Sequence, residues 1–422
     1  MLTHLKIRQL FGRFDYDVHL MDGGVSILTG PNGYGKSTIL HILSSISSKK
    51  IYELFELEFR IIELFFEDGY INRRRFTIEK KGKEFLIDGI HISSKSFRKM
   101  LNMEKHKMPK YFWNNKSISL FDDNLDEKYF FNEINDSFFI EHIEEEATKE
   151  KKDEKKLFAV INEISKLCGK TRIISDQRLL KKINRNGEDG IEDTISSLPH
   201  ALKDIIEGVS SEYSVKANSL DSTYPKRLLS SQYGISEMQY RIQLAEAQIK
   251  FKKLREYKLA EISLLEGGVY DQRFADALKI YFEDFFSKYK VFENLIDQLD
   301  LFTSVINNRL KFKYIEISKE KGFVLIDETQ GKELELKKLS SGEKQEILLF
   351  FDLIFNTDNY EVLLIDEPEL SLHISWQQQF MDDLLKVTKM NNLQVIIATH
   401  SPQIIGNHWD IQIDLGELYN GY

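Results

Sequence analysis

Hydrophobic residues near the N-terminus follow the short periods of β-strands. Apolar and polar positions alternate over Leu5–Arg8 and through Tyr52–Ile92, and Val25–Thr29 is a short apolar run. A period of two predicts half-buried strands, and Asp-Gly pairs at 68–69 and 88–89 predict hairpin turns between them. We therefore expect a small antiparallel sheet in this part of the chain.

Helical spacing dominates the middle of the chain. A run at 233–265 carries apolar residues every three or four positions, Gly267-Gly268 interrupts it, and a second helical pattern starts at Ala275. In the first run, the residues at this spacing form an apolar stripe: Ile235, Met238, Ile242, Ala245 and Ile249. The two runs predict an antiparallel helical hairpin of about 30 residues per arm. The stripe is expected to face the protein's own core or another subunit.

Strands and helices alternate again toward the C-terminus. The strands are expected at 313–317, 323–326, 362–365 and 395–398, with helices after Gly342 and at 373–388. Strand–helix alternation predicts an α/β fold with a parallel sheet. The chain would then divide into an N-terminal lobe at 1–94, a mainly helical insertion at 95–310 and a C-terminal lobe at 311–422.

Composition narrows the class of protein. The 422 residues suffice for two or three domains, and 42% hydrophobic with 30% charged residues fits a real core under a charged surface. A net charge of −9 argues against a generally basic nucleic-acid binder. Cys168 is the only cysteine, which excludes an intrachain disulfide and a cysteine zinc cluster. No apolar run of about 18 residues occurs, so we expect a cytoplasmic protein without a membrane span.

A phosphate-binding pattern occupies the junction between the strand at 25–29 and the helix that follows. Gly30-Pro31-Asn32-Gly33-Tyr34-Gly35-Lys36-Ser37-Thr38 fits the P-loop sequence. Such a loop wraps phosphates with backbone N–H groups, its lysine reaches the β- and γ-phosphates, and its serine binds Mg²⁺. The nucleotide-binding candidates here are Asn32, Gly33, Gly35, Lys36, Ser37 and Thr38. ATP and Mg²⁺ are the expected ligands.

Two acidic residues follow a second buried strand, and together they form the motif expected to accompany a P-loop. Val362–Ile365 is followed by Asp366 and Glu367. Asp366 is expected to hold Mg²⁺, and Glu367 to polarise the attacking water. The two motifs lie more than 300 residues apart, which the inserted middle region would explain.

A third motif, Leu339–Gln345, precedes an apolar helix. Its Ser340, Ser341, Gly342 and Glu343 could be an ordinary helix N-cap, but beside the P-loop they resemble the ABC signature sequence. In ABC-type ATPases this helix start binds the γ-phosphate held by the opposite subunit. That resemblance implies a head-to-tail homodimer with two composite sites.

The same resemblance assigns further residues. His400, in Ala398-Thr399-His400-Ser401-Pro402, resembles the switch histidine that senses the γ-phosphate. Ser371-Leu372-His373 stands where the family has its D-loop, with His373 replacing the usual aspartate. Gln177 is the candidate Q-loop residue, binding nucleotide and metal, although a capped loop would have the same sequence.

Three segments refine the family: Leu10–Asp15, Leu220–Arg227 and Glu369–His373 followed by Trp376-Gln377. Together they resemble the OLD-like ABC-type ATPases of bacterial anti-phage defence, in particular the ATPase subunits of the Septu (PtuA) and PARIS (AriA) systems. The resemblance of these three segments does not distinguish the two types. The OLD nucleases carry a C-terminal TOPRIM domain, whereas about 20 residues follow Ser401-Pro402.

The resemblance implies an ATP-hydrolysing sensor or scaffold subunit. It would assemble with itself, as a dimer or a larger ring, and control a separate HNH or TOPRIM nuclease. The alternative is an SMC-like DNA-repair ATPase that clamps DNA directly, for which Arg73-Arg74-Arg75 and Lys105–Lys110 are the candidate contacts. Solvated strand or helix faces would explain these basic clusters equally well. A transporter ATPase is a weaker alternative still.

Overall fold

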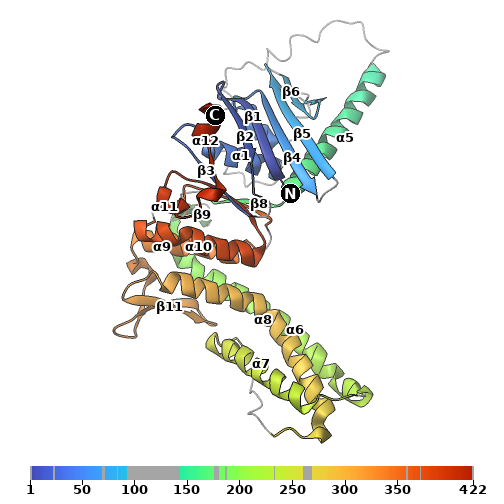
Figure 1. Cartoon of the computed structure of the whole chain (residues 1–422), viewed down its shortest axis with the longest axis vertical. Coiled ribbons are helices and arrows are strands. Elements are labelled where there is room, and N and C mark those ends of the chain that lie inside the picture. The colour runs from blue at the N-terminus through green and yellow to red at the C-terminus, as the bar shows by residue number, and fades with distance from the viewer. Residues whose placement is uncertain are drawn as a thin grey trace. The chain divides into compact units, whose positions relative to one another are not determined.

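The chain forms two compact units. Unit 1 comprises Met1–Asp176, Asn359–Leu370 and Gln377–Tyr422, and unit 2 comprises Gln177–Asp358 and Ser371–Trp376. The computed structural model describes residues 2–21, 24–68, 72–82, 84–92, 143–174, 180–185, 188–231, 233–259, 269–357, 360–370 and 372–420 (Figure 1).

Unit 1 contains the parallel sheet. Its five strands lie in the order β16-β3-β15-β14-β8, and every neighbouring pair is parallel. The strands are β3 (Val25–Thr29), β8 (Thr171–Ile174), β14 (Val362–Asp366), β15 (Gln394–Ala398) and β16 (Gln412–Asp414). β3, β14 and β15 therefore end at one edge, and β15 separates the other two. In open α/β sheets this carboxyl edge is where ligands bind.

A six-stranded antiparallel sheet completes unit 1, in the order β2-β1-β4-β5-β6-β7. Its strands are β1 (Leu2–Leu10), β2 (Phe14–His19), β4 (Ile61–Asp68), β5 (Asn72–Lys81), β6 (Glu84–Ile87) and β7 (Ile90–His91). Asp88 and Gly89 have positive φ angles of 49° and 74° in the turn between β6 and β7, which confirms that predicted hairpin. The other predicted turn includes Gly69, which lies outside the described residues.

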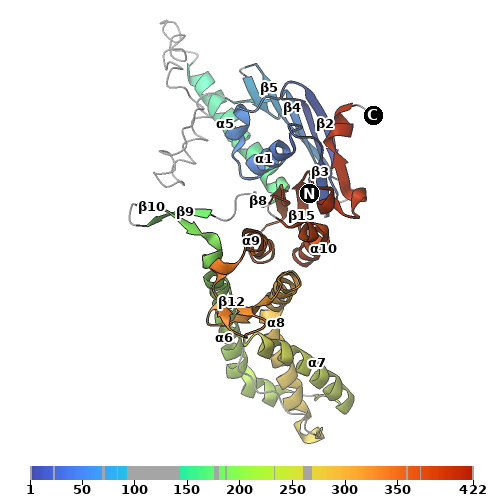
Figure 2. The same cartoon turned by 90° about the vertical axis from the view of Figure 1, so that its left-hand side faces the viewer.

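The helices of unit 1 are α1 (Lys36–Ser47), α5 (Ile143–Cys168), α10 (Ile374–Asn391), α11 (Pro402–Ile405) and α12 (Leu415–Asn420), with short 3-10 turns at Ile51–Phe55 and Trp409–Ile411; the first residues of α10 belong to unit 2. α1 packs against α5 and against β8, β14 and β15 (Figure 2). Its apolar face joins the core shared with the antiparallel sheet, because Ile39, Leu40 and Leu43 are buried there. Cys168 at the end of α5 is also buried, and burial raises the pKa of its thiol to about 12.

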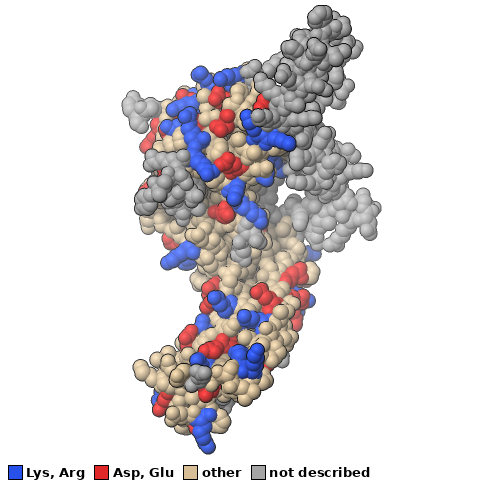
Figure 3. Space-filling model, turned by 90° about the vertical axis from the view of Figure 1, so that its right-hand side faces the viewer, with Lys and Arg blue, Asp and Glu red and all other residues tan. Residues whose placement is uncertain are grey.

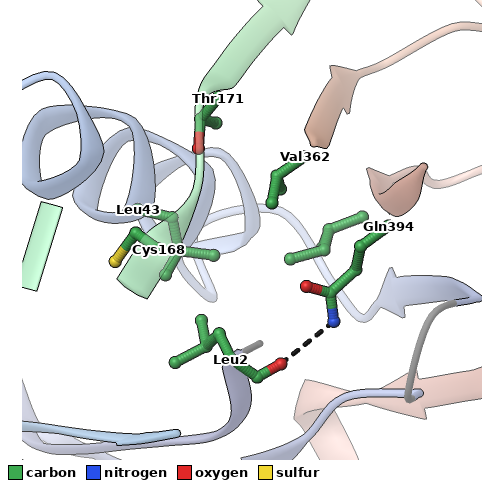
Figure 4. A pocket seen from close by; sticks show the side chains of 7 residues that line it. Leu2, Leu43, Cys168, Thr171, Val362 and Gln394 are labelled. Atoms are coloured by element: carbon green, nitrogen blue, oxygen red, sulfur yellow. Dashed lines mark hydrogen bonds between the residues drawn. The ribbon is translucent and has the colours of Figure 1, made fainter. Parts of the chain in front are cut away.

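A buried glutamine links the two sheets of unit 1. Gln394 at the start of β15 donates its amide to the Leu2 carbonyl at 3.0 Å and to the Met21 carbonyl at 3.2 Å. Figure 4 shows this side chain next to Leu2, across a cavity of about 10 Å³ from Cys168. That volume has room for one water molecule at most. The contact therefore holds the first strand of the chain against the parallel sheet.

Unit 2 is built mainly from helices. They are α6 (Leu198–Ser230), α7 (Glu237–Glu256), α8 (Ala275–Asn307) and α9 (Ser341–Phe355), with 3-10 turns at Thr194–Ser197, Gln272–Phe274 and Leu336–Lys338. Two small sheets accompany them: the pair β9 (Leu180–Arg185) and β10 (Glu188–Asp193), and the sheet β11-β12-β13, formed by Lys313–Ser318, Gly322–Asp327 and Glu333–Leu334.

An antiparallel helix pair is present in unit 2, but its members differ from those predicted. α6 and α8 run in opposite directions: Arg227 pairs with Asp284, whereas Tyr213, earlier in α6, packs on Phe292, later in α8. α7 instead runs parallel to α8, because Lys250 pairs with Glu293 and Lys253 with Asp300 (Figure 1). The predicted pairing of the runs flanking Gly267-Gly268 as an antiparallel hairpin is therefore wrong.

α7 buries a different face from the one its apolar stripe predicted. Ile235 is buried just before the helix, but Met238, Ile242 and Ile249 are 75%, 56% and 69% exposed, and Ala245 is exposed too. The buried face consists of Tyr240, Ala247, Phe251 and Leu254. Tyr240, Ala247 and Phe251 share a core with Phe282 and Phe285 of α8, so the aromatic face of α7 is the one that packs on α8.

The compact units cut across the predicted domain limits. α5 and β8 lie within the predicted insertion at 95–310 but belong to unit 1, where β8 pairs with β14. β11, β12, β13 and α9 lie within the predicted C-terminal lobe but belong to unit 2. The antiparallel sheet, the parallel sheet and the large helical region confirm the expected mixed α/β architecture.

Charges are mixed on the surface. On the face in Figure 3, Lys and Arg side chains alternate with Asp and Glu side chains rather than forming one basic patch. No helix within the described part of the chain is both long and apolar enough to cross a membrane.

Candidate nucleotide-binding site

The P-loop lies at the carboxyl end of β3 and leads into α1. Gly30, Gly33 and Gly35 have φ angles of 137°, 83° and 87°, which side-chain-bearing residues rarely adopt. A Cβ on Gly35 would also come within 2.9 Å of the Leu10 side chain. The glycines therefore allow both the curvature of the loop and its close approach to β1. Asn32 and Gly33 are exposed at its tip, and Thr38 is half-buried in α1.

Lys36 is buried at the base of this loop. Its ammonium donates hydrogen bonds to the carbonyls of Gly30 at 3.0 Å and Pro31 at 3.3 Å. The same nitrogen lies 2.5 Å from His400 Nε2. Burial lowers the pKa of Lys36, and the carboxylates of Glu367 and Asp366 oppose that change.

The first turn of α1 meets the end of β14. Ser37 donates its hydroxyl to Asp366 Oδ1 at 2.9 Å, although 329 positions separate the two residues. A hydroxyl and a carboxylate are hard oxygen donors of the kind that Mg²⁺ prefers, and two protein ligands suffice when phosphates and waters complete the shell. The residues present therefore fit a Mg²⁺ ion at this point.

Glu367 and His400 meet beside this pair. Glu367 Oε1 lies 3.2 Å from His400 Nε2. The backbone of Glu367 has a φ of 46°, and its N–H donates to the Ala398 carbonyl at 2.9 Å, which fixes the residue against the end of β15. The pKa of Glu367 is raised to about 7. Burial is the largest cause, and the neighbouring Glu369 carboxylate is the second. Burial and Lys36 lower the pKa of His400, so its imidazole is neutral at pH 7.

Glu369 organises the histidine, a role that we did not predict. Its Oε1 accepts hydrogen bonds from the Thr399 hydroxyl at 2.7 Å and from the backbone N–H groups of His400 at 2.7 Å and Ser401 at 3.1 Å. The loop after β15 is therefore held by a residue from the loop after β14. The available signal was a third acid two positions after Glu367 in Asp-Glu-Pro-Glu.

The predicted signature residues lie in unit 2 at the start of α9. Ser340 is the N-cap, and its side chain forms a capping box with Glu343. Glu343 accepts a hydrogen bond from the Ser340 N–H at 2.8 Å, and it forms an ion pair with Lys313 at 3.0 Å. The helix-cap interpretation therefore holds for Ser340 and Glu343. Ser341 is exposed and Gly342 half-exposed in the first turn of the helix. Gln177, the predicted Q-loop residue, lies outside the described residues.

His373 caps a helix. Its Nδ1 lies 2.9 Å from the Ser375 hydroxyl and 3.4 Å from the Ser375 N–H, just before α10. A ring nitrogen here takes the place of the aspartate oxygen that commonly accepts such bonds at an N-cap.

The basic cluster Arg73-Arg74-Arg75 has local ion-pair partners among its described side chains. Arg74 pairs with Glu163, and Arg75 with Glu63, so these arginines do not form an unpaired basic cluster. Lys105–Lys110 lie outside the described residues, as does the side chain of Arg73.

The Leu220–Arg227 segment has a structural role in α6. Arg227 makes a two-pronged contact to Asp284 of α8, at 2.6 and 2.8 Å, and donates to the Leu220 carbonyl at 2.8 Å. The segment therefore fastens α6 to α8 near Pro225, which lies inside the helix.

Known proteins similar to this chain include two retron proteins described as probable ATPases. It is 36% identical over 91 residues to a retron Ec83 probable ATPase of Escherichia coli, which covers 19% of this chain and 16% of that protein. It is 36% identical over 86 residues to a retron Vc95 probable ATPase of Vibrio cholerae, covering 18% and 16%. The chain thus spans about a sixth of the length of these curated relatives.

Among solved structures, SMC head domains of Pyrococcus furiosus and Thermotoga maritima align over 96% of this chain and 90% of theirs. Their sequence identities are 11% and 12%, and their TM-scores are 0.38 and 0.36. The model of the AAA ATPase domain family matches residues 1–405. The chain therefore belongs to the AAA ATPase domain family.

Proposed function

We propose that this chain binds ATP with Mg²⁺ and hydrolyses it at the carboxyl edge of the parallel sheet. The observation that carries the proposal is the 2.9 Å contact between Ser37 and Asp366, beside the Glu367–His400 pair. These four residues come from α1, β14 and the loops after β14 and β15. Their convergence supports one site that combines a phosphate loop, a metal-binding pair and a candidate base.

Each residue has a distinct part in the proposed reaction. Backbone N–H groups from Asn32 through Thr38 cradle the phosphates, and Lys36 exchanges its loop carbonyl contacts for phosphate oxygens. Mg²⁺ held by Ser37 and Asp366 would supply positive charge to the phosphates. Glu367 accepts a proton from the attacking water, and a pKa of about 7 suits a base that works near neutral pH. His400, neutral and held by Glu369, donates a hydrogen bond toward the terminal phosphate.

Two variants test this assignment. Glu367→Gln keeps the shape of the side chain but removes the base, so it should bind ATP while turnover falls by about a hundredfold or more. Lys36→Ala should lose nucleotide binding, measured by fluorescent ATP titration. Unchanged turnover in Glu367→Gln, or unchanged ATP affinity in Lys36→Ala, would contradict the proposed site. Lys386→Ala, which removes an exposed lysine from α10, is the matched lysine control and should retain ATP binding.

We further propose that hydrolysis serves as a switch between two copies of the chain. Ser341 and Gly342 are accessible in the first turn of α9, and helix geometry leaves the first N–H groups of a helix without intrahelical acceptors. Such a helix start suits the terminal phosphate of ATP held by Lys36 of another copy. ATP binding would then bring the copies together head to tail.

The setting that we propose is bacterial anti-phage defence, with the switch controlling a separate nuclease subunit of HNH or TOPRIM type. The similarity to two retron ATPases supports this setting. The nuclease can be sought by co-purification with the wild-type chain and with Glu367→Gln, in the presence of ATP. If Lys36→Ala bound the nuclease as well as the wild type does, control by nucleotide would be contradicted.

A further inference from the structure

A cluster of metal-binding side chains lies on the antiparallel sheet, away from the P-loop motifs. It consists of His4 on β1 and of Asp17 and His19 on β2. Strand register explains the cluster: His4 is the cross-strand partner of His19, and Lys6 is the partner of Asp17. All four side chains project from one face, because side chains two positions apart on a strand share a face. Leu5 and Val18, which alternate with them, are buried on the other face.

The geometry of the cluster fits a small metal ion. One nitrogen from each histidine and one Asp17 oxygen all lie within 4.8 Å of one another. His19 Nε2 is 3.2 Å from Asp17 Oδ1, and His4 Nε2 contacts the same oxygen. The two imidazole rings stack with centroids 3.9 Å apart, and the Nε2 atom of each lies against Asp17 Oδ1. Tetrahedral Zn²⁺ sites use these ligand types, and three protein ligands leave a fourth position for water.

The neighbouring side chains favour this use. Lys6 binds the other carboxylate oxygen, Asp17 Oδ2, at 3.0 Å, which orients the carboxylate and leaves Oδ1 toward the histidines. His4 is fixed by stacking on Phe65 at 4.6 Å. Such supporting contacts orient metal ligands in proteins.

We propose that His4, Asp17 and His19 bind one divalent transition-metal ion of the Zn²⁺ type. The ion would tie β2, an edge strand of the sheet, to β1 at the open end of their hairpin. This site differs in ligand type from the pair Ser37 and Asp366. Imidazole nitrogen suits Zn²⁺, whereas the hard oxygens of that pair suit Mg²⁺.

Isothermal titration of the full chain with Zn²⁺ tests the proposal, in excess Mg²⁺ and without nucleotide, because phosphates also bind Zn²⁺. We expect one ion per chain and a rise in the thermal midpoint, since an ion that binds only the folded state stabilises it. His19→Ala should weaken Zn²⁺ binding by about tenfold or more, because even outer contacts of a metal site change affinity about 10- to 100-fold.

The histidine side chain removed in this variant is 73% exposed, so the variant should fold. His408→Ala is the matched control: His408 also lies 3.3 Å from a carboxylate, Asp382, but belongs to no cluster of three among the described residues. It should bind Zn²⁺ as the wild type does. No Zn²⁺ uptake by the wild type, or equal uptake by His19→Ala, would overturn the proposal.

Discussion

The negative charge of Glu367 is destabilising in the folded protein. Burial and the Glu369 carboxylate raise its pKa to about 7, so the folded chain holds a proton that the unfolded chain has released above its usual carboxyl pKa. The protonated group contributes stability at low pH, and this contribution is lost as pH rises toward 7.

Glu367→Gln should remove this pH dependence. We expect the nucleotide-free variant to match the wild type near pH 4.5 and to become more stable than the wild type as pH approaches 7 and above. Thermal melts across this range measure the difference. A constant difference at every pH would contradict the raised pKa.

Glu369→Gln should shift the pH dependence of turnover. The substitution keeps an oxygen that can accept from Thr399 and His400, but it removes the negative charge that raises the pKa of Glu367. The acidic limb of the ATPase pH profile should therefore move to lower pH. Glu369→Ala, which loses the acceptor too, should lower turnover at all pH values. If Glu369→Gln leaves the acidic limb in place, Glu369 does not set that pKa.

At this scale the sequence was most informative where chemistry requires fixed spacing. The P-loop, Asp366-Glu367 and His400 were predictable because each follows a strand at a defined distance. Glu369 was not, because its function depends on where the loop after β15 passes, and that is a tertiary contact. The local role of His373 was also hidden, since its cap partner is visible only in three dimensions.

Elements were easier to locate than to orient. The α7 sequence contains two apolar faces, and periodicity alone does not say which one is buried. The stripe through Ile242 and Ile249 fits helical spacing as well as the face through Tyr240 and Phe251. The aromatic face is the buried one because α8 offers Phe282 and Phe285 opposite it. The parallel direction of α7 and α8 was equally hidden, because a long connection separates them.

Substitutions on these two faces should have unequal effects. Phe251→Ala should lower the free energy of unfolding by about 3 kcal/mol, toward the lower end for a buried phenylalanine because its ring lies at the edge of the core. Ile249→Ala, on the exposed face, should change it by less than about 0.5 kcal/mol. Urea denaturation of both variants gives the comparison. Equal losses would show that the exposed face is covered in solution.

A buried ion pair anchors α9 to the end of α8. Arg309 Nε lies 2.8 Å from Glu346 Oε1, with the two side chains 2% and 3% exposed, and the guanidinium lies 4.7 Å from the centre of the Phe350 ring. Glu346→Ala should cost about 3–5 kcal/mol of stability, because it removes the carboxylate that neutralises a buried guanidinium. Arg309→Met combined with Glu346→Leu should recover much of this loss. If the single variant melts like the wild type, the pair does not support α9.

On the scale of the whole molecule, the proposed head-to-tail arrangement makes a prediction about mixtures. Lys36→Ala disables the P-loop, and Gly342→Asp places a negative charge at the start of α9. Each variant alone should be inactive. A mixed dimer combines both defects in one site and leaves the other intact, so an equal mixture should recover about a quarter of wild-type turnover if the two sites act independently. No recovery would argue against sites shared between copies.

The order of the parallel sheet has a consequence for biosynthesis. β3 is made well before both of its neighbours, β15 and β16, which follow it by hundreds of residues. About 365 residues separate the end of β3 from the start of β15, and ribosomes add about 5–20 residues per second, so the strand waits roughly 20–70 seconds for a partner. During that interval its two hydrogen-bonding edges are open, which exposes the nascent chain to wrong pairing. The proposed ATP site also needs Asp366 and His400, so ATP cannot support folding through that complete site before those residues have been made.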